Sequence, residues 1–280
     1  MAPTDERLDP DRRDAVLDRL GFPAPPPVDL DGLTAIYGAW CARVPFDNLR
    51  KLIALHGGAT GPLPGLGADD FFDAWLAHGT GGTCWPSANA LHALLDSIGF
   101  SSRRVTASMF DRGEPSHGTT IVVLDGAEHL VDSSMLTGTP LPLDPAGPTT
   151  TPGDGFVHGA RPVPEGWLFE FTRVSVDGPL PCRTLAPDAT PLAFFEERYE
   201  VSRTWSPFND HVNVLVNRPH GAISLVGGHR YERPVGGPIS ELEGGPVDEP
   251  ELRAALMEEI GYSEQLVDDL FQVWKPPPPT

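Results

Sequence analysis

The chain has 280 residues and a formal net charge of −19, and it is 40% hydrophobic and 21% charged. It is long enough to bury a large core, and its composition excludes a disordered chain, a collagen-like repeat and a disulfide scaffold. The excess of carboxylates makes nucleic acid and anionic membranes poor partners. A run of about 18 apolar residues and a signal-peptide pattern are both absent, so we expect a cytoplasmic protein.

Residues 1–99 have the pattern of a helical region. Apolar residues recur there at three- and four-residue spacings, which predicts amphipathic helices. Prolines and glycines crowd residues 22–27 and 57–67, and such a composition predicts loops. The expected helices span Asp11–Leu20, Leu30–Cys41, Asp69–His78 and Trp85–Ile98.

From Phe100 onward the pattern changes to short runs rich in β-branched and aromatic residues. Each run ends near Gly, Pro or Asp, which is typical of strands in an antiparallel sheet. We therefore expect an antiparallel sheet or barrel in the middle of the chain. The strand patterns lie at residues 103–110, 119–124, 128–133 and 167–176.

A third region mixes helix and strand patterns. Helical spacing returns at residues 191–201, two strand patterns follow at 211–218 and 222–232, and a last helix is expected at 249–262. The run of prolines near the end can form neither helix nor ladder hydrogen bonds, so residues 276–280 are expected to be a disordered tail. The fold class expected from these patterns is α+β.

Cys84 is the first candidate for chemistry, because it stands at the predicted start of a helix. The positive end of the helix dipole favours a thiolate there, and the backbone amides of Thr83 to Trp85 are candidate oxyanion donors. Gly81 and Gly82 leave the approach free of side chains, so we expect a substrate to come close to them. Taken alone, a cysteine at a helix start is more often a small buried apolar residue. A partner base would change that interpretation.

His117 and Asp132 flank a predicted hairpin that could supply this base. Asp125 and Gly126 form a strong two-residue turn signal between two strand patterns. If these two residues make the turn, paired residues have numbers that add to the same sum, so His117 faces Ser134 and lies diagonal to Asp132 on one face. The register therefore predicts that the imidazole and the carboxylate lie side by side.

Cys84, His117 and Asp132 together suit thiol chemistry. An imidazolium stabilises a neighbouring thiolate, and a carboxylate orients the ring and stabilises its charge, which allows an acyl-thioester intermediate. No metal site is expected, since CxxC and HxxxH spacings are absent. Of the other cysteines, Cys41 is expected in the helical core and Cys182 in a loop beside prolines.

The motifs of the chain resemble, in order, those of the arylamine N-acetyltransferase family. The family has a G-G-x-C-aromatic turn, an I/V-P-F-E-N-L segment, an L-G-F helix end, a histidine, an L-V-D aspartate and an S-P-F segment. The matching residues span most of the chain, which makes the ordered set highly specific. They are Gly81–Trp85, Val44–Leu49, Ile98–Phe100, His117, Leu130–Asp132 and Ser206–Phe208.

The resemblance implies a fold of three parts with a papain-like triad, Cys84, His117 and Asp132, at the junction of the first two. Its expected domains are a helical bundle over residues 1–99, a β-barrel over 100–188, an interdomain helix over 189–204 and an α/β lid over 205–275.

The resemblance also implies a ping-pong acyl transfer to an amine. Cys84 would accept an acyl group from acetyl-coenzyme A or another acyl thioester, and His117 would move the proton. A small-molecule amine would then take the acyl group, with no permanently bound cofactor. Phe46 and Phe208 are the expected substrate contacts.

Three departures from the family pattern affect this interpretation. Pro86, Ser87 and Ala88 stand where the family commonly has an acidic residue with Asn shortly after the cysteine. Thr80 stands where the family commonly has arginine, which leaves Asp47 without its usual cationic neighbour unless Arg50 or Lys51 substitutes. Residues 133–136 read S-S-M-L in place of V-G-F-G, so the lost glycine could reshape the acyl pocket beside the aspartate.

Three hypotheses therefore remain for the function. The first is an arylamine N-acetyltransferase-like enzyme that uses an acyl-coenzyme A donor. The second is an amide synthase that takes a longer acyl chain from an acyl carrier protein. The third is a noncatalytic ligand-binding protein with the same fold, which an unreactive Cys84 would favour.

Overall fold

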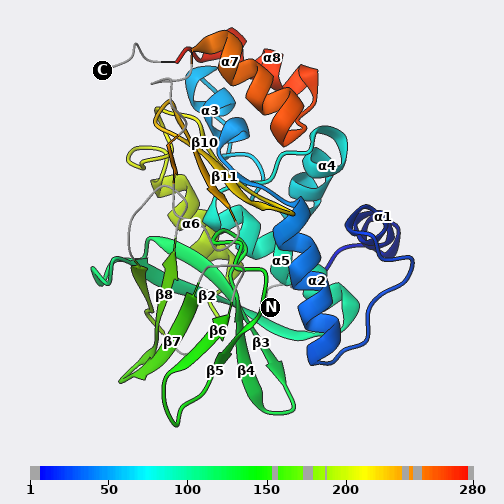
Figure 1. Ribbon diagram of the computed structural model, residues 1–280, viewed down its shortest axis with the longest axis vertical. Coiled ribbons are helices and arrows are strands. Elements are labelled where there is room, and N and C mark those ends of the chain that lie inside the picture. Colours follow the sequence, from blue (N-terminus) through cyan, green and yellow to red (C-terminus); the bar gives the residue numbers. More distant parts are fainter. Residues whose placement is uncertain are drawn as a thin grey trace.

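The computed structural model of the chain describes residues 7–152, 157–172, 179–186, 188–234, 240–241 and 248–276. Within these residues the strands form an eight-stranded and a five-stranded antiparallel sheet. In Figure 1 the larger sheet curls into a barrel at the bottom, in green, and the C-terminal helices lie at the top, in orange and red. The predicted fold class, α+β with an antiparallel barrel, is confirmed.

The helices predicted in residues 1–99 are confirmed within two residues at each end. The Asp9 side chain caps the first of them by accepting a hydrogen bond from the backbone of Arg12, and Gly21 ends it in the left-handed region, at φ +91°. No helix of the described residues is both long and apolar enough to cross a bilayer. The four helices are α1 (Pro10–Leu20), α2 (Leu30–Arg43), α4 (Ala68–His78) and α5 (Cys84–Ile98).

The sequence pattern missed a short strand, β1 (Phe46–Asp47), and the helix that follows it, α3 (Leu49–His56). Eight residues are too few for a helical period to stand out. Leu49 and Leu52 are fully buried in an apolar cluster that they share with the C-terminal helices. Tertiary packing, rather than local pattern, therefore stabilises α3.

The barrel is an almost closed sheet in the order β5-β4-β3-β2-β9-β8-β7-β6. Its edge strands are consecutive in the chain, and the Thr149 hydroxyl donates to the Pro142 carbonyl between them. Four of the strands were not predicted, because they are short or interrupted by proline. The strands are β2 (Ser101–Met109), β3 (His117–Leu124), β4 (Ala127–Val131), β5 (Leu141–Leu143), β6 (Thr149–Pro152), β7 (Val157–Val163), β8 (Gly166–Thr172) and β9 (Pro179–Thr184).

The smaller sheet runs in the order β1-β10-β11-β12-β13. The single strand predicted at residues 222–232 is wrong, because Gly227 and Gly228, at φ +62° and +85°, make a tight hairpin turn inside it. The helix predicted at 191–201 is confirmed as α6 (Leu192–Val201). The strands after it are β10 (Asn213–Arg218), β11 (Gly221–Val226), β12 (His229–Pro234) and β13 (Ser240–Glu241).

The last helical segment is divided in three. The helix predicted at 249–262 consists of α7 (Glu249–Ala254) and a π-helical turn, η1 (Ala255–Ile260), which Gly261 ends at φ +87°. The sequence pattern missed α8 (Glu264–Val273), which packs near α3 at the top of Figure 1.

Residues 46–56 join the N-terminal and C-terminal parts of the chain. The strand β1 pairs with β10, and α3 shares an apolar cluster with α8. The predicted domain boundaries at 99, 188 and 204 stay predictions. Of the predicted tail at 276–280, all but Pro276 lies outside the described residues, as do residues 173–176 of one predicted strand.

The side-chain amide of Asn48 stabilises this junction, and both its nitrogen and its oxygen have hydrogen-bond partners. Its Nδ2 donates to the carbonyls of Phe208, at 2.9 Å, and His211, at 2.8 Å, and its Oδ1 accepts from the backbone N–H of Asn213, at 2.8 Å. Asn48 is 1% exposed. If its amide is removed, the backbone groups that it binds have no water molecule to replace it as a hydrogen-bond partner. Asn48 therefore fixes the segment 208–213 against the N-terminal region.

We expect Asn48→Ala to lower the free energy of unfolding by about 3 kcal/mol, since three hydrogen bonds of about 1 kcal/mol each are lost inside the protein. Urea unfolding followed by tryptophan fluorescence measures this change. Gln272→Ala, which truncates an exposed amide on α8, is the control and should stay within about 0.5 kcal/mol of the wild type. Equal stability of both variants would contradict the structural role of Asn48.

Candidate functional site

A cavity of about 250 Å³ lies where the start of α5, the loop between β2 and β3, and the segment after α6 meet. The structure brings every site residue predicted from the sequence, except Asp132, to the wall of this cavity. Asp132 lies directly behind His117. The wall includes Cys84, His117, Thr83, Trp85, Phe46 and Phe208.

Cys84 is the first residue of α5, as the sequence pattern predicted. Thr83 precedes the helix with extended backbone, and no side chain caps its first turn. The first amides of a helix have no intrahelical acceptor, so those of Cys84 and Trp85 remain available at the cavity. Cys84 is 7% exposed, and its Sγ lies 4.0 Å from the carbonyl oxygen of Ser116, the residue before His117.

Gly81 and Gly82, which precede Cys84, allow neighbouring residues of the protein to lie close to their backbone. A Cβ on Gly81 would lie 1.9 Å from the carbonyl oxygen of Pro45, and a Cβ on Gly82 would lie 3.1 Å from both Phe71 and Pro86. The expectation that these glycines leave space for a substrate is therefore wrong. Because they lack a side chain, the segment of Pro45 and the turn before Cys84 can lie in contact. This contact fixes the position of the thiol.

The buried carboxylate of Asp47 binds the same turn through hydrogen bonds. It accepts hydrogen bonds from the Thr80 hydroxyl at 3.0 Å, the Gly81 N–H at 2.7 Å and the Tyr262 hydroxyl at 2.9 Å. Burial raises the pKa of Asp47, although these three donors oppose the shift. Neutral donors thus replace the cation expected from the family pattern.

Neither of the two cations considered as a substitute contacts Asp47. Arg50 forms an ion pair with Asp70 at 2.7 Å, and Lys51 donates to Ser202. The suggested substitution of Arg50 or Lys51 for the missing arginine is therefore wrong. Both side chains have other partners, and the hydroxyls of Thr80 and Tyr262 satisfy the carboxylate.

His117 and Asp132 meet as the hairpin register predicts. Asp125 and Gly126 form the turn at φ +49° and +82°, and Leu124 pairs with Ala127 across it. His117 Nε2 lies 2.7 Å from Asp132 Oδ2, and both side chains are buried. The other ring nitrogen is free of Asp132, and Cys84 is among the neighbours that raise the pKa of the imidazole.

The pair is charged over a wide pH range. Burial alone would lower the pKa of His117, but the charge and hydrogen bond of Asp132 outweigh it and raise the pKa to about 10. Burial alone would raise the pKa of Asp132, but the charge and hydrogen bond of His117 outweigh it and lower the pKa to about 2. An imidazolium therefore lies beside Cys84 at neutral pH.

The segment after Asp132 holds its second oxygen. Oδ1 accepts from the N–H of Ser134 at 3.0 Å, the Ser134 hydroxyl at 3.0 Å and the N–H of Met135 at 2.9 Å. Leu136 has φ +52°, in the left-handed region that a glycine would adopt without cost. The departure from the family pattern thus adds a hydroxyl donor to the aspartate and places a strained leucine where the family has glycine.

The other two cysteines have no part in this chemistry. Cys41 is buried on α2, as predicted, and burial raises its pKa to about 12. Cys182 was expected in a loop, but it lies on β9 with its side chain inside the barrel, where burial raises its pKa well above the usual value. No group of His, Cys, Asp and Glu in the described part of the chain could hold a metal ion.

The sequence analysis missed several residues of the cavity wall. Lys51, Arg198 and Ser202 line one end of it, and Trp205, which is 53% exposed, lies on its rim. The sequence contains one hint, because Lys51 is one of only two lysines in an otherwise arginine-based set of cations. The wall itself forms only when α3 and α6 pack together.

Comparisons with known proteins agree with this geometry. The profile of a family described as N-acetyltransferase matches residues 29–263. The chain matches no curated protein by sequence. The solved arylamine N-acetyltransferase from Mycobacterium abscessus is 18% identical, with a TM-score of 0.75, and the similarity covers 95% of this chain and 94% of that one.

Two further solved structures are similar in the same way. A cysteine-to-glutamine variant of the Mycobacterium smegmatis enzyme is 19% identical, with a TM-score of 0.77, over 95% of this chain and 99% of that one. The arylamine N-acetyltransferase from Salmonella typhimurium is 16% identical, with a TM-score of 0.76, over 95% and 100%. The shared fold extends over nearly the whole length of each chain.

We expect Gly81→Ala to destabilise the protein by about 1–3 kcal/mol, because the new methyl group must displace the Pro45 carbonyl or the turn. It should also slow alkylation of Cys84, whose position depends on that turn. Thermal unfolding and the rate of iodoacetamide labelling measure the two effects. Gly147→Ala, at a site with open space, should change neither, and a stable, fully reactive Gly81→Ala variant would refute the close-contact argument.

We expect alkylation of Cys84 to depend on Asp132. His117 stays protonated below a pKa of about 10 and Asp132 stays ionised above a pKa of about 2, so the ion pair persists over the whole neutral range. In Asp132→Asn burial lowers the pKa of His117, the imidazolium is lost near neutral pH, and alkylation at pH 7 should slow by roughly tenfold or more.

The rate of iodoacetamide labelling between about pH 5 and pH 9 tests this expectation. Asp144→Asn, an exposed substitution in the barrel, is the matched control. A similar rate and pH profile in Asp132→Asn and the wild type would show that the ion pair does not activate the thiol.

Proposed function

Since the chain belongs to the arylamine N-acetyltransferase family, and is thus an N-acetyltransferase that moves an acyl group to an amine, we propose that it uses an acyl-coenzyme A donor and a Cys84 acyl-enzyme. The observation that carries this proposal is the buried His117–Asp132 pair beside Cys84 in the wall of one cavity. A thiolate beside an imidazolium is a nucleophile that needs no further base.

In the first half-reaction the Cys84 sulfur attacks the carbonyl carbon of the acyl thioester. The bond between that carbon and the sulfur of coenzyme A breaks, and the imidazolium of His117 gives its proton to the departing thiolate. Free coenzyme A leaves, and the enzyme keeps an acyl thioester on Cys84 and a neutral imidazole. Asp132 holds the ring in one orientation through both states.

In the second half-reaction the amine attacks the carbonyl carbon of the acyl-enzyme. His117 accepts the proton that the amine loses, the bond to the Cys84 sulfur breaks, and the amide leaves. The thiolate and the imidazolium are then restored together. Because the two substrates use the same sulfur in turn, the kinetics are ping-pong.

Backbone amides stabilise the oxyanion of both steps in this proposal. The free amides at the start of α5, next to Thr83 and Trp85, point their dipoles at the same cavity as the thiol. Phe46 and Phe208, whose ring centroids are 5.3 Å apart in an edge-to-face pair, form an apolar wall for the substrates. Their exposure to the cavity supports their proposed role as substrate contacts.

Two similar structures support these roles. The arylamine N-acetyltransferase of Bacillus cereus, 16% identical with a TM-score of 0.73, is described as having a Cys-His-Glu catalytic triad. The structure from Mycobacterium smegmatis is that of a cysteine variant. A cysteine, a histidine and a carboxylate residue are the groups that this chain brings together at Cys84, His117 and Asp132.

The other two functional hypotheses have less support. Family membership makes the chain an enzyme, which argues against a noncatalytic binding protein. No feature of the described residues favours an acyl carrier protein as donor. A small acyl-coenzyme A is therefore the donor proposed here, with a small-molecule amine as the acceptor.

We expect a brief incubation with acetyl-coenzyme A to add one acetyl group to the protein, at Cys84, as measured by intact mass and peptide mapping. Because Cys41 and Cys182 are buried with raised pKa values, the adduct should be confined to Cys84. Adding 4-aminobenzamide should remove it and release the acetylated amine.

Cys84→Ala should form no adduct, and His117→Ala should form it at least roughly a hundredfold more slowly, because general acid–base catalysis is lost. A panel of longer acyl-coenzyme A donors, tested in the same way, identifies the preferred acyl group. Absence of an adduct with every donor in the folded wild type would overturn the proposed mechanism.

A further inference from the structure

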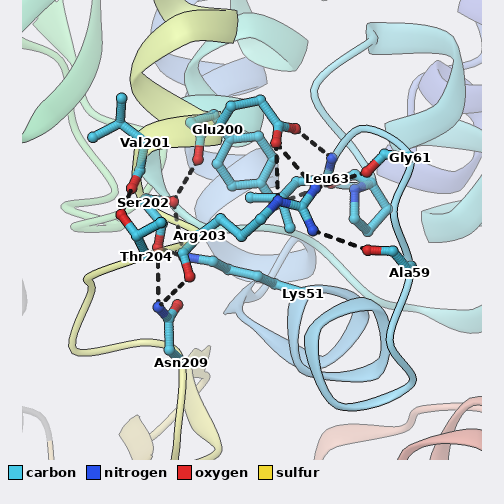
Figure 2. A network of polar contacts seen from close by, with 12 residues as sticks. Lys51, Ala59, Gly61, Leu63, Glu200, Val201, Ser202, Arg203, Thr204 and Asn209 are labelled. Atoms are coloured by element: carbon cyan, nitrogen blue, oxygen red, sulfur yellow. Dashed lines mark hydrogen bonds and ion pairs between the residues drawn. The ribbon is translucent and has the colours of Figure 1, made fainter.

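Lys51 is a buried lysine at the end of the catalytic cavity. It lies on α3, is 2% exposed, and lines the cavity together with Cys84. Its Nζ donates to the Ser202 hydroxyl at 2.9 Å and to the Ser202 carbonyl at 3.3 Å, and it lies 5.8 Å from the centre of the Tyr199 ring. Figure 2 shows the side chain reaching from α3 toward Ser202.

No carboxylate of the described residues forms an ion pair with Lys51. The nearest acidic neighbour, Glu200, is already engaged, because it pairs with Arg203 at 3.0 Å and accepts from the backbone N–H of Leu63. Figure 2 shows Glu200 and Arg203 bound to each other and to the loop of Ala59–Leu63. This network engages Glu200, so Lys51 has no ion-pair partner among the described residues.

Arg198 adds a second cation at the same end of the cavity. It stands four residues before Ser202, so the two side chains share one face of the end of α6. Arg198 lines the cavity, and its buried Nε has no hydrogen-bond partner in the part of the chain that the structure describes. Lys51 from α3 and Arg198 from α6 thus line the same cavity.

A buried cation without a counter-ion costs free energy, and this cost is visible in Lys51. Burial is the main cause that lowers its pKa to about 8, the charge of Arg203 lowers it further, and the charges of Cys84 and Glu200 raise it. An anion bound beside Nζ would remove this cost. Natural proteins retain such a group when a ligand supplies the missing charge.

The position of Lys51 relative to Cys84 indicates which kind of anion binds there. The phosphates of coenzyme A are separated from its sulfur by the pantetheine arm, so they lie far from Cys84 when the thioester reaches it. Lys51, in contrast, is close enough to Cys84 for their charges to interact. A small anionic group next to the reacting carbonyl is the chemistry that suits this place, and a carboxylate matches both a lysine and an arginine.

We propose that Lys51, with Ser202 and Arg198, binds a carboxylate of the substrate and makes the enzyme selective for a carboxylated substrate. This inference rests on the proposed function, since it assigns a substrate class to the same cavity. The carboxylate is carried either by the amine, as in an aminobenzoate, or by the acyl group, as in a dicarboxylic monothioester. Both sources present the same group to Lys51, and the experiment separates them.

Binding of product amides tests the proposal without any turnover. The probes are 4-acetamidobenzoate, with the carboxylate on the amine part, and N-phenylsuccinamate, with the carboxylate on the acyl part. Reductive ¹³C-methylation labels the two lysines of the chain, Lys51 and Lys275, and their NMR signals report the pKa of each amine. One of the carboxylates should raise the pKa of Lys51 and leave Lys275 unchanged, while the neutral 4-acetamidobenzamide should change neither.

Transient kinetics provide the second test. We expect the wild type to prefer 4-aminobenzoate over 4-aminobenzamide in deacylation, or succinyl-coenzyme A over butyryl-coenzyme A in acylation, by about tenfold or more in kcat/KM. Lys51→Met should abolish this preference through KM, and Lys51→Arg should retain part of it. Lys275→Met, in the other lysine and outside the cavity, is the matched control and should keep the preference.

The outcomes separate this proposal from the proposed function. A wild type that is acetylated on Cys84 but binds neither carboxylate at Lys51 would overturn the carboxylate site alone. A wild type that forms no acyl-enzyme but shows the raised Lys51 pKa with one carboxylate would overturn the thioester mechanism and support the anion site. An unchanged preference in a folded Lys51→Met variant would also refute the role of Lys51.

Discussion

The hydrogen-bonded ion pair between His117 and Asp132 is the interaction on which the rest of the site depends. The barrel supplies both residues from one hairpin, at a distance of 2.7 Å. Burial would by itself neutralise each group, and only their mutual attraction keeps both charged. In the proposed mechanism this pair activates the buried cysteine at the start of α5, which requires the barrel and α5 to be held in fixed contact.

Buried polar groups near Cys84 also join segments that are far apart in the chain. The carboxylate of Asp47 binds the glycine turn before Cys84 and also Tyr262, far along the chain. The amide of Asn48 binds the segment that carries Phe208. These groups are costly to leave unpaired, so they specify one arrangement of the segments that they join. The cavity is formed by that arrangement.

The charge of the cavity contrasts with that of the whole protein. The chain carries a net charge of −19, yet Lys51 and Arg198 line one end of the cavity without a carboxylate partner among the described residues. Because Lys51 is buried, its charge acts on the cavity more strongly than a distant excess of negative charge does. Family membership assigns acyl transfer to an amine, and the proposed preference for a carboxylated substrate rests on this local charge.

The sequence by itself determined the elements with a clear period and the pairing across one turn. Four helices of the first region, four of the barrel strands, the helix start at Cys84 and the register that joins His117 to Asp132 all follow from local pattern and turn chemistry. Only the tertiary structure decided which side chains face each other across regions. Gly81 meets Pro45, Thr80 and Tyr262 replace the expected cation at Asp47, and Lys51 meets Ser202 because α3 and α6, far apart in the chain, pack together. Periodicity describes one element at a time, and it carries no information on contacts between elements.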